Sequence, residues 1–423
     1  MGIFVTLVLA RRRGPLAKAG ATFALCTMLV VAAGCSSEPA PSAVSSETSA
    51  TATGGVASAT RTSTSSDLTL GPQTVAVPGS LEDGDIVAGT LVTKDACTGG
   101  QDQVQVFDPT AGKLVTVSAP PEPADETRTS LMCTVFTRNG DYYVSFAVSS
   151  QTKASGLNGS QSRHRLYTYP LGSTTPTVID LKGELRSLVS TDAGPAVVLS
   201  NGPEFTLAVY SGEGPTPTWT APTSADGITG VGSAIMTELA PQLTLLDAAT
   251  GKPLYSRCAS DQAGFLAEVS DGFVTVRDDC GPDRQGTLVG YDTATKKEVF
   301  AIAPASGLYV PDDLSASADY LLILGNKRLV VIDRESGETV VTKSGDDFEK
   351  LNIQNAFVFA DRLYLSTKTG GKSVVSLPSG TTESESWTVR PTAMLDGWTL
   401  VIRDNGDREL IRDQNGAYPG PWS

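Results

Sequence analysis

Histidine chemistry would have to run through one residue of this chain. The sequence contains a single histidine, His164, within the polar segment from Gln161 to Arg165. Any Ser-His-Asp triad or histidine-ligated metal site therefore depends on it. The neighbouring polar stretch from Ser149 to Ser162 predicts a long loop, and we expect His164 to be a histidine of that surface loop.

Clustered carboxylates are a second candidate for chemistry, because their oxygens suit calcium. None of the clusters has the twelve-residue ligand spacing of an EF-hand loop, so we interpret them as turn carboxylates and predict no metal site and no catalytic pair. They are Asp278 and Asp279 with Asp283, Asp312 with Asp313, Asp346 with Asp347, and Asp404 with Asp407.

The cysteines are a third candidate, as disulfides of an exported chain. Of six cysteines, Cys26 lies in an N-terminal apolar segment and Cys35 follows it. An even number in an exported chain predicts two disulfides. No Cys-x-x-Cys spacing for zinc, redox or haem chemistry is present. The four remaining cysteines are Cys97, Cys133, Cys258 and Cys280.

The N-terminus has the pattern of a signal peptide. Arg11 to Arg13 and Lys18 precede an apolar run from Ala19 to Ala33, which is short for a membrane span. The ending Ala32-Ala33-Gly34-Cys35 resembles the lipobox of bacterial lipoproteins, although that family more often has Leu where Ala32 stands. The resemblance implies cleavage after residue 34 and diacylation of Cys35, which would anchor the chain to the extracytoplasmic side of the cell membrane. The alternative is an ordinary signal peptide followed by a chance cysteine.

Residues 35–66 are rich in Ser, Thr and Ala and have almost nothing to bury, so we expect a disordered tether. Removal of residues 1–34 takes away four basic residues and no acidic ones, which changes the net charge from −14 to −18. Such a surface repels nucleic acid and anionic headgroups, so we predict no nucleic-acid partner.

The rest of the chain repeats one pattern: an apolar strand, Asp, three residues, Gly, and a second apolar strand. Asp hydrogen-bonds to backbone N–H groups just ahead of it, and Gly adopts the positive φ that reverses the chain. The pattern therefore predicts a tight turn between antiparallel strands. It occurs at Asp108 with Gly112, Asp247 with Gly251 and Asp333 with Gly337, and at Asp292 without the glycine.

The spacing of these turns predicts an all-β propeller spanning residues 67–423. Asp247, Asp292 and Asp333 follow one another at 45 and 41 residues, a period typical of propeller blades. Placing each turn between the third and fourth strands gives seven blades, with weaker marks near Pro170, Ser211 and Leu377. The segment from Thr392 to Ile411 then supplies three strands of an eighth, which we expect residues 74–77 to close. A count of seven blades stays open.

The turn resembles the repeat of the pyrroloquinoline-quinone-type propeller family, Ala-x-Asp-x-x-Thr-Gly-Lys-x-x-Trp. Asp247, Thr250, Gly251 and Lys252 match it, with Tyr255 at the Trp position. Trp219 and Phe300 occupy that position in two other blades. The family includes quinoprotein dehydrogenases and a lipoprotein that supports outer-membrane barrel assembly. Its dehydrogenases use a vicinal disulfide, which this chain lacks, so we predict no cofactor.

Propeller geometry also predicts the disulfide pairing. Cys97 falls in the loop between the second and third strands of blade one, and Cys133 falls at the start of blade two. Cys258 ends blade four, and Cys280 falls in the corresponding loop of blade five. All four then lie on one face, so we predict the bridges Cys97–Cys133 and Cys258–Cys280.

These observations favour a non-catalytic, lipid-anchored envelope protein that binds or scaffolds a protein, peptide or glycan. The alternative is an exported enzyme of the quinoprotein, lyase or hydrolase type that uses the central channel. We expect Trp398 and Trp422, near the closing blade, to be exposed packing residues rather than a stacking platform.

Overall fold

The computed structural model describes residues 74–414, except 78–80, 82–84, 89, 94–96, 98–101, 155–158, 224–226, 240–241, 259–266, 271, 279–285 and 312–318. The segments predicted to be a signal peptide and a tether lie outside the described residues, as do Cys35, Cys280 and Trp422. Residues Leu68–Ser423 form one compact unit. No described helix is long and apolar enough to cross a membrane.

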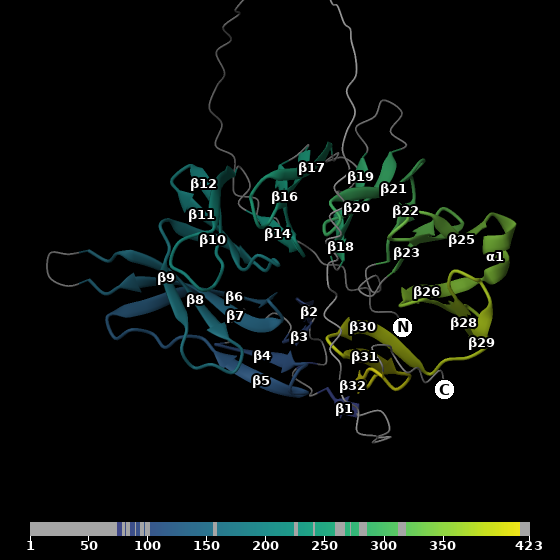
Figure 1. Ribbon diagram of the computed structural model, residues 1–423, viewed down its shortest axis with the longest axis horizontal. Coiled ribbons are helices and arrows are strands. Elements are labelled where there is room, and N and C mark those ends of the chain that lie inside the picture. The colour runs from purple at the N-terminus through teal and green to yellow at the C-terminus, as the bar shows by residue number, and fades with distance from the viewer. Residues whose placement is uncertain are drawn as a thin grey trace, which may run out of the picture. The chain divides into compact units, whose positions relative to one another are not determined.

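The unit is an eight-bladed β-propeller, and every blade is a four-stranded antiparallel sheet (Figure 1). The prediction of eight blades is therefore confirmed. Strands run from the innermost strand of each blade outward in chain order, except in the last blade.

Blades one to four contain strands β2 to β17. Blade one has β2 Asp85–Val87, β3 Thr90–Val92, β4 Gln103–Asp108 and β5 Lys113–Ser118; blade two has β6 Glu126–Arg138, β7 Asp141–Thr152, β8 Ser162–Pro170 and β9 Thr177–Asp180; blade three has β10 Glu184–Val189, β11 Ala196–Asn201, β12 Glu204–Val209 and β13 Trp219–Thr223; blade four has β14 Ile228–Val231, β15 Ala234–Leu239, β16 Gln242–Asp247 and β17 Pro253–Cys258.

Blades five to eight contain the remaining strands. Blade five has β18 Ala267–Ser270, β19 Phe273–Asp278, β20 Thr287–Asp292 and β21 Lys297–Ile302; blade six has β22 Leu308–Tyr309, β23 Tyr320–Gly325, β24 Arg328–Asp333 and β25 Thr339–Ser344; blade seven has β26 Ile353–Phe359, β27 Arg362–Thr367, β28 Lys372–Ser376 and β29 Thr382–Ser384; blade eight has β30 Val389–Leu395, β31 Trp398–Arg403, β32 Arg408–Arg412 and β1 Thr74–Ala76.

The ring closes by pairing of the two ends of the chain. β1 lies antiparallel to β32, with Thr74 opposite Ile411 and Ala76 opposite Glu409 (Figure 1). The N-terminal strand thus completes a sheet whose other three strands come from the C-terminus, and the edge of β32 is covered. This closing strand is the one that the sequence predicted.

The hydrophobic core is a set of layers between the blades. Clusters of buried apolar side chains occupy the interface between each blade and the next, including the interface of blade eight with blade one. Each sheet is therefore buried on both faces, which explains why its strands lack strict alternation of apolar and polar residues.

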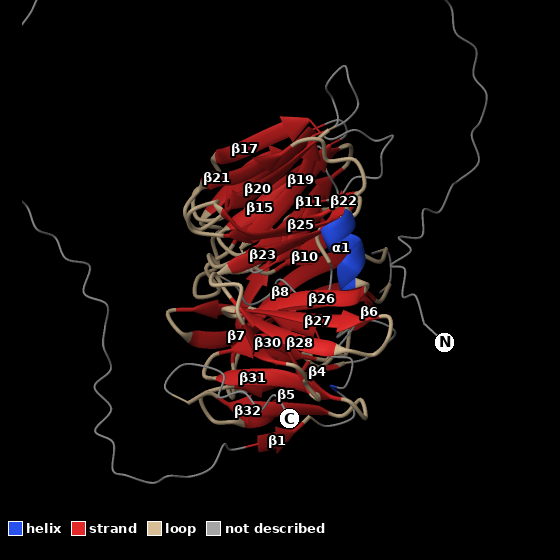
Figure 2. Ribbon diagram, turned by 90° about the vertical axis from the view of Figure 1, so that its right-hand side faces the viewer, coloured by secondary structure: helices blue, strands red, loops and turns tan. Residues whose placement is uncertain are grey.

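One helix interrupts the strands. α1, Asp346–Leu351, lies between blades six and seven and has no buried residue (Figure 2). The all-β prediction did not include this helix, because six residues are too few to show a helical period. Its acidic first turn, with Asp346 and Asp347, complements the helix dipole, so these carboxylates have a structural role.

Candidate binding face

Strand direction assigns the loops to two faces of the ring. The loops between second and third strands, and the links from blade to blade, lie on what we call the link face. The Asp turns between third and fourth strands lie on the opposite, turn face. β1 runs antiparallel to β32 and begins at Thr74 on the turn face, so the chain enters the ring on that side.

The Asp turns have the geometry that their sequence implies. The Asp247 carboxylate accepts hydrogen bonds from the backbone N–H groups of Ala249 at 3.0 Å and Thr250 at 2.9 Å. Gly251 has a φ of +70°. Asp108, Asp292 and Asp333 accept equivalent bonds from the residues two or three positions ahead. These carboxylates are thus occupied in shaping the backbone.

The turn that lacks glycine makes a different contact. Lys296 occupies the glycine position of the Asp292 turn and has a φ of +59°. Its Nζ donates to the Asp247 carboxylate of the preceding blade at 2.5 Å. Burial alone would raise the pKa of Asp247, but the bonds from Lys296 and Thr250 bring it below its usual value.

Two tryptophans fasten these turns to the preceding blade. The Trp219 indole Nε1 donates to the Ala248 carbonyl oxygen at 2.7 Å, and the Trp398 indole Nε1 donates to the Pro109 carbonyl oxygen at 2.9 Å. Trp398 is only 4% exposed, so the expectation of an exposed side chain is wrong, although the packing role is correct. Blade one buries the Trp398 side chain, and the local sequence of blade eight does not show that contact.

The link face carries one large departure from the repeat. β6, β7 and β8 of blade two have 13, 12 and 9 residues, whereas described strands of the other blades have at most seven. The additional residues lie toward the link face, and blade two projects beyond its neighbours (Figure 1). At about 3.3 Å per residue, six additional residues carry a strand roughly 20 Å farther.

A buried ion cluster holds this extension together. The Glu126 side chain is 1% exposed, and its carboxylate accepts bonds from Arg163 and Arg165, each at 2.8 Å, and from the Ser150 hydroxyl at 2.6 Å. The Arg165 bonds are the main reason that the pKa of Glu126 falls to about 2, against the opposing effect of burial. Arg165 also donates to Asp180 of the outer strand at 3.2 Å.

An open hollow of about 620 Å³ lies beside the cluster and is lined by Arg163, His164, Arg165 and Asp180, among others. His164 lies in β8, not in a surface loop as predicted, and it forms a 2.8 Å hydrogen bond with Ser149. Burial lowers the pKa of His164, which favours the neutral ring. The predicted loop from Ser149 to Ser162 is also shorter, because Ser149 belongs to β7 and Ser162 begins β8.

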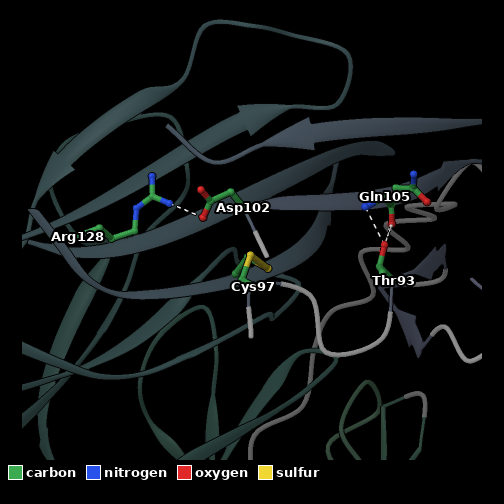
Figure 3. The surroundings of a disulfide bond; sticks show 6 residues. Thr93, Cys97, Asp102, Gln105 and Arg128 are labelled. Atoms are coloured by element: carbon green, nitrogen blue, oxygen red, sulfur yellow. Dashed lines mark hydrogen bonds and ion pairs between the residues drawn. A yellow bond between two sulfur atoms is a disulfide. The ribbon is translucent and has the colours of Figure 1, made fainter. Parts of the chain in front are cut away.

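A disulfide joins blades one and two on the link face. Cys97 and Cys133 are bonded, with their Cα atoms 5.7 Å apart. Close to it, Arg128 donates to the Asp102 carboxylate at 2.5 Å (Figure 3). Arg128 also donates to the Pro120 carbonyl oxygen at 2.5 Å. A covalent bond at the base of the extension and an arginine within it therefore join blade two to blade one. Cys133 lies within β6 rather than at its start.

Several other residues that the sequence singled out lie outside the described part of the chain. Cys258 ends β17, but its side chain and Cys280 lie outside the described residues, so that bridge stays a prediction. Asp279, Asp283, Asp312 and Asp313 also lie outside them. Among described residues, no group of three His, Cys, Asp or Glu side chains is placed to hold a metal ion.

The Glu126 cluster was not predicted from the sequence. Arg163 and Arg165 stand two positions apart, which on a strand places both on one side, but the polar residues around them resembled a loop. Their partner is 37 and 39 residues away, and only the strand pairing of blade two brings it close.

Comparison with known proteins gives no match to a family model and none to a curated protein. Solved structures give propellers. BamB from Moraxella catarrhalis has a TM-score of 0.40 at 13% identity, covering 82% of this chain and 98% of that one. The computationally designed Ika8 protein has a TM-score of 0.37 at 12% identity, with 78% and 95% covered. The WD40 domain of Toxoplasma gondii coronin has a TM-score of 0.29 at 10% identity, with 64% and 80% covered. Identities this low say nothing of a ligand or partner.

Proposed function

We propose that this protein is a lipid-anchored module of the cell envelope that binds a protein partner through its link face. The observation that carries the proposal is the extension of blade two. Closure of the ring needs no such projection, since the described strands of the other blades have at most seven residues. A projecting sheet that is joined to blade one and held together by a buried ion cluster offers a rigid surface to a partner.

The way in which the extension is stabilised supports a role in recognition. A buried ion pair contributes little net stability compared with apolar packing, because desolvation of both charges offsets their attraction. Glu126 with Arg163 and Arg165 thus fixes the shape of the extension and leaves polar groups at its surface. The Arg163 side chain remains 47% exposed, so it is available to a partner.

The chain enters the ring on the turn face, which is compatible with a lipid anchor on the N-terminal segment. The first described strand begins at Thr74 on the turn face, so the segment that would carry a lipid on Cys35 joins the ring on the side opposite to the link face. Two acyl chains hold a protein stably on a membrane, whereas one does so marginally. Substitution Cys35→Ala should release the protein from the membrane fraction into the medium. Retention of this variant in the membrane fraction would refute the anchor.

The binding role is tested with a photo-crosslinking amino acid placed on either face. We expect adducts of one defined mass from Gln151 and Ser162, which are exposed on the extension, after irradiation of intact cells. The matched positions Thr110 and Glu335 are exposed on the turn face and should give none. Equal adducts from both faces, or none from the extension, would refute a link-face partner.

A further inference from the structure

We infer that the hollow beside His164 binds a carboxylate of the partner protein when the histidine is protonated. The hollow has a volume of about 620 Å³, and its lining includes His164, Arg163, Arg165 and Asp180. It lies on the extension of blade two. This inference therefore rests on the proposed function, and it adds a chemical class of contact and a pH dependence to the same face.

The hollow lies beside a step at the outer edge of blade two. β8 begins at Ser162, but β9 pairs with it only from Arg165 onward. The chain leaves β9 at Asp180, and the N–H group of Leu181 donates to the His164 carbonyl oxygen at 2.8 Å. The first three residues of β8 therefore extend past β9. The first two of them are exposed, so a ligand can reach this edge.

One nitrogen of the His164 ring is left for a ligand. Nδ1 forms the 2.8 Å hydrogen bond with the Ser149 hydroxyl. No hydrogen bond joins Nε2 to another residue that the structure describes. A protonated imidazole donates from both nitrogens, and a hydroxyl can accept. Protonation of His164 therefore keeps the contact with Ser149 and makes Nε2 a charged donor.

The charged groups of blade two around His164 balance one another while the ring is neutral. Arg163 and Arg165 flank it on β8, and both donate to the buried Glu126 carboxylate. Arg165 also donates to Asp180 at 3.2 Å, so two cations face two carboxylates. Protonation of the ring adds one net positive charge to this group, and a local positive charge attracts anions.

Blade three adds a second balanced pair near the ring. Burial lowers the pKa of His164, and the charge of Glu184, at the start of β10, raises it to a smaller extent. Glu184 accepts a bond from Arg186 at 2.8 Å. Lys182 is exposed in the link to β10, and β7 places the uncharged Ser149 opposite the ring. Burial therefore keeps the ring neutral near pH 7, and the hollow gains its charge as the pH falls.

Arg163 supplies a second contact for a carboxylate. Its exposed side chain donates to Glu126 through one Nη atom, and its Nε and second Nη atoms have no partner among the described residues. Such a guanidinium edge binds a carboxylate with two parallel hydrogen bonds. Arg163 and His164 point to opposite faces of β8, but both line the hollow because it lies at the edge of the strand. A carboxylate there would contact Arg163 at any pH and gain a charged bond from His164 only after protonation.

The single histidine gives the test a direct readout. The full chain in mild detergent, prepared without a histidine tag and with carbon-13-labelled histidine, has one ring signal, that of His164. Its titration between pH 5 and pH 8 is followed by NMR with and without saturating acetyl-Gly-Glu-Gly-amide. This Glu peptide should raise the titration midpoint by about one pH unit, which corresponds to about tenfold tighter binding to the protonated ring. The same peptide with Gln in place of Glu should leave the midpoint where it is.

His164→Gln should abolish the pH dependence of binding. The amide of glutamine can still bond to Ser149, but it carries no charge at any pH. Anisotropy of a rhodamine-labelled Glu peptide should show that the wild type binds about threefold or more tightly at pH 5.5 than at pH 7.5. The variant should bind equally at the two pH values, at the weaker affinity.

Three further variants locate the site. Arg163→Gln should weaken binding about tenfold at both pH values and keep the rise of the midpoint. Asp180→Asn removes an exposed competing carboxylate and should tighten binding about threefold. Lys350→Gln, at an exposed lysine of α1, is the matched control and should leave binding unchanged. Each variant is first shown to melt as the wild type does.

Several outcomes would overturn the inference: an unchanged midpoint with the Glu peptide, an equal rise with the Gln peptide, or a pH-dependent affinity that survives in His164→Gln. Unchanged binding by Arg163→Gln or weaker binding by Asp180→Asn would also overturn it. A larger rise of the midpoint with inorganic sulfate than with the Glu peptide would identify a site for small anions instead. Because the assay uses a short peptide and no cellular partner, a failure here leaves the crosslinking test of the proposed function intact.

Discussion

The indole Nε1 of Trp398 lies 2.9 Å from the carbonyl oxygen of Pro109, across 289 residues of sequence. Trp398 begins β31 in the last blade, and Pro109 lies in the Asp turn of the first. The Trp398 ring also meets Phe107 edge-on, with ring centroids 5.5 Å apart. A side chain thus fastens the two ends of the ring on the turn face, in addition to the strand pairing of β1 with β32.

Replacement of Trp398 by Phe should weaken the closure of the ring. The phenylalanine side chain would still fill most of the site, but the Pro109 oxygen would lose its hydrogen-bond donor. The expected cost is about 1–2 kcal/mol in the free energy of unfolding. Urea denaturation followed by circular dichroism measures it. Trp219→Phe removes the same kind of bond at the junction of blades three and four and should cost a similar amount. A cost near zero for Trp398→Phe would contradict a closing role.

Gly251→Ala should destabilise the protein more than Gly380→Ala. Both glycines have a similar positive φ, +70° and +72°, so alanine pays the left-handed penalty of about 1–2 kcal/mol at either position. A Cβ on Gly251 would also lie 2.6 Å from the Trp219 ring, whereas one on Gly380 meets nothing within 4 Å. The difference between the two variants in thermal unfolding therefore measures the packing of the turn on Trp219. Equal effects would show that the ring moves aside freely.

The propeller could be predicted because its repeated turns depend on residues that are close together in the sequence. The Asp of each turn bonds to nearby backbone N–H groups, and the Gly allows a positive φ. Asp247 and Gly251 therefore predict the turn without any tertiary context. Lys296 shows the limit of such reasoning: a lysine with positive φ is tolerated there because its Nζ reaches Asp247 of another blade. The Glu126 cluster could not be predicted in this way, because Glu126 is 37 and 39 residues from Arg163 and Arg165 and only the strand pairing of the folded blade brings them together.

Glu126→Gln should reduce stability at neutral pH and leave it nearly unchanged in strong acid. The pKa of Glu126 is about 2 in the folded protein, against an ordinary value of 4.5, so the folded state favours the charged carboxylate. That contribution is complete above about pH 5 and is lost as the pH falls toward 2; its size is on the order of 3 kcal/mol.

Urea titrations of wild type and Glu126→Gln between pH 7 and pH 3 measure this difference. The gap between the two proteins should stay constant from pH 7 to about pH 5 and narrow below that as the pH falls toward 3. Glu349→Gln, which removes an exposed partner of Lys327, is the control and should give a small gap at every pH. A gap for Glu126→Gln that is independent of pH would show that the residue contributes by packing and not by charge.

Loss of the Cys97–Cys133 bridge should destabilise the protein without opening the ring. The bridge spans 36 residues, and a loop of that length corresponds to about 4 kcal/mol in the chain-entropy account. The double variant Cys97→Ala with Cys133→Ala should therefore unfold at lower urea while keeping its β circular dichroism. Non-reducing peptide mapping of the wild type should recover Cys97 joined to Cys133, and Cys258 joined to Cys280. Recovery of Cys97 joined to Cys258 would contradict the blade assignment, because those residues belong to blades one and four.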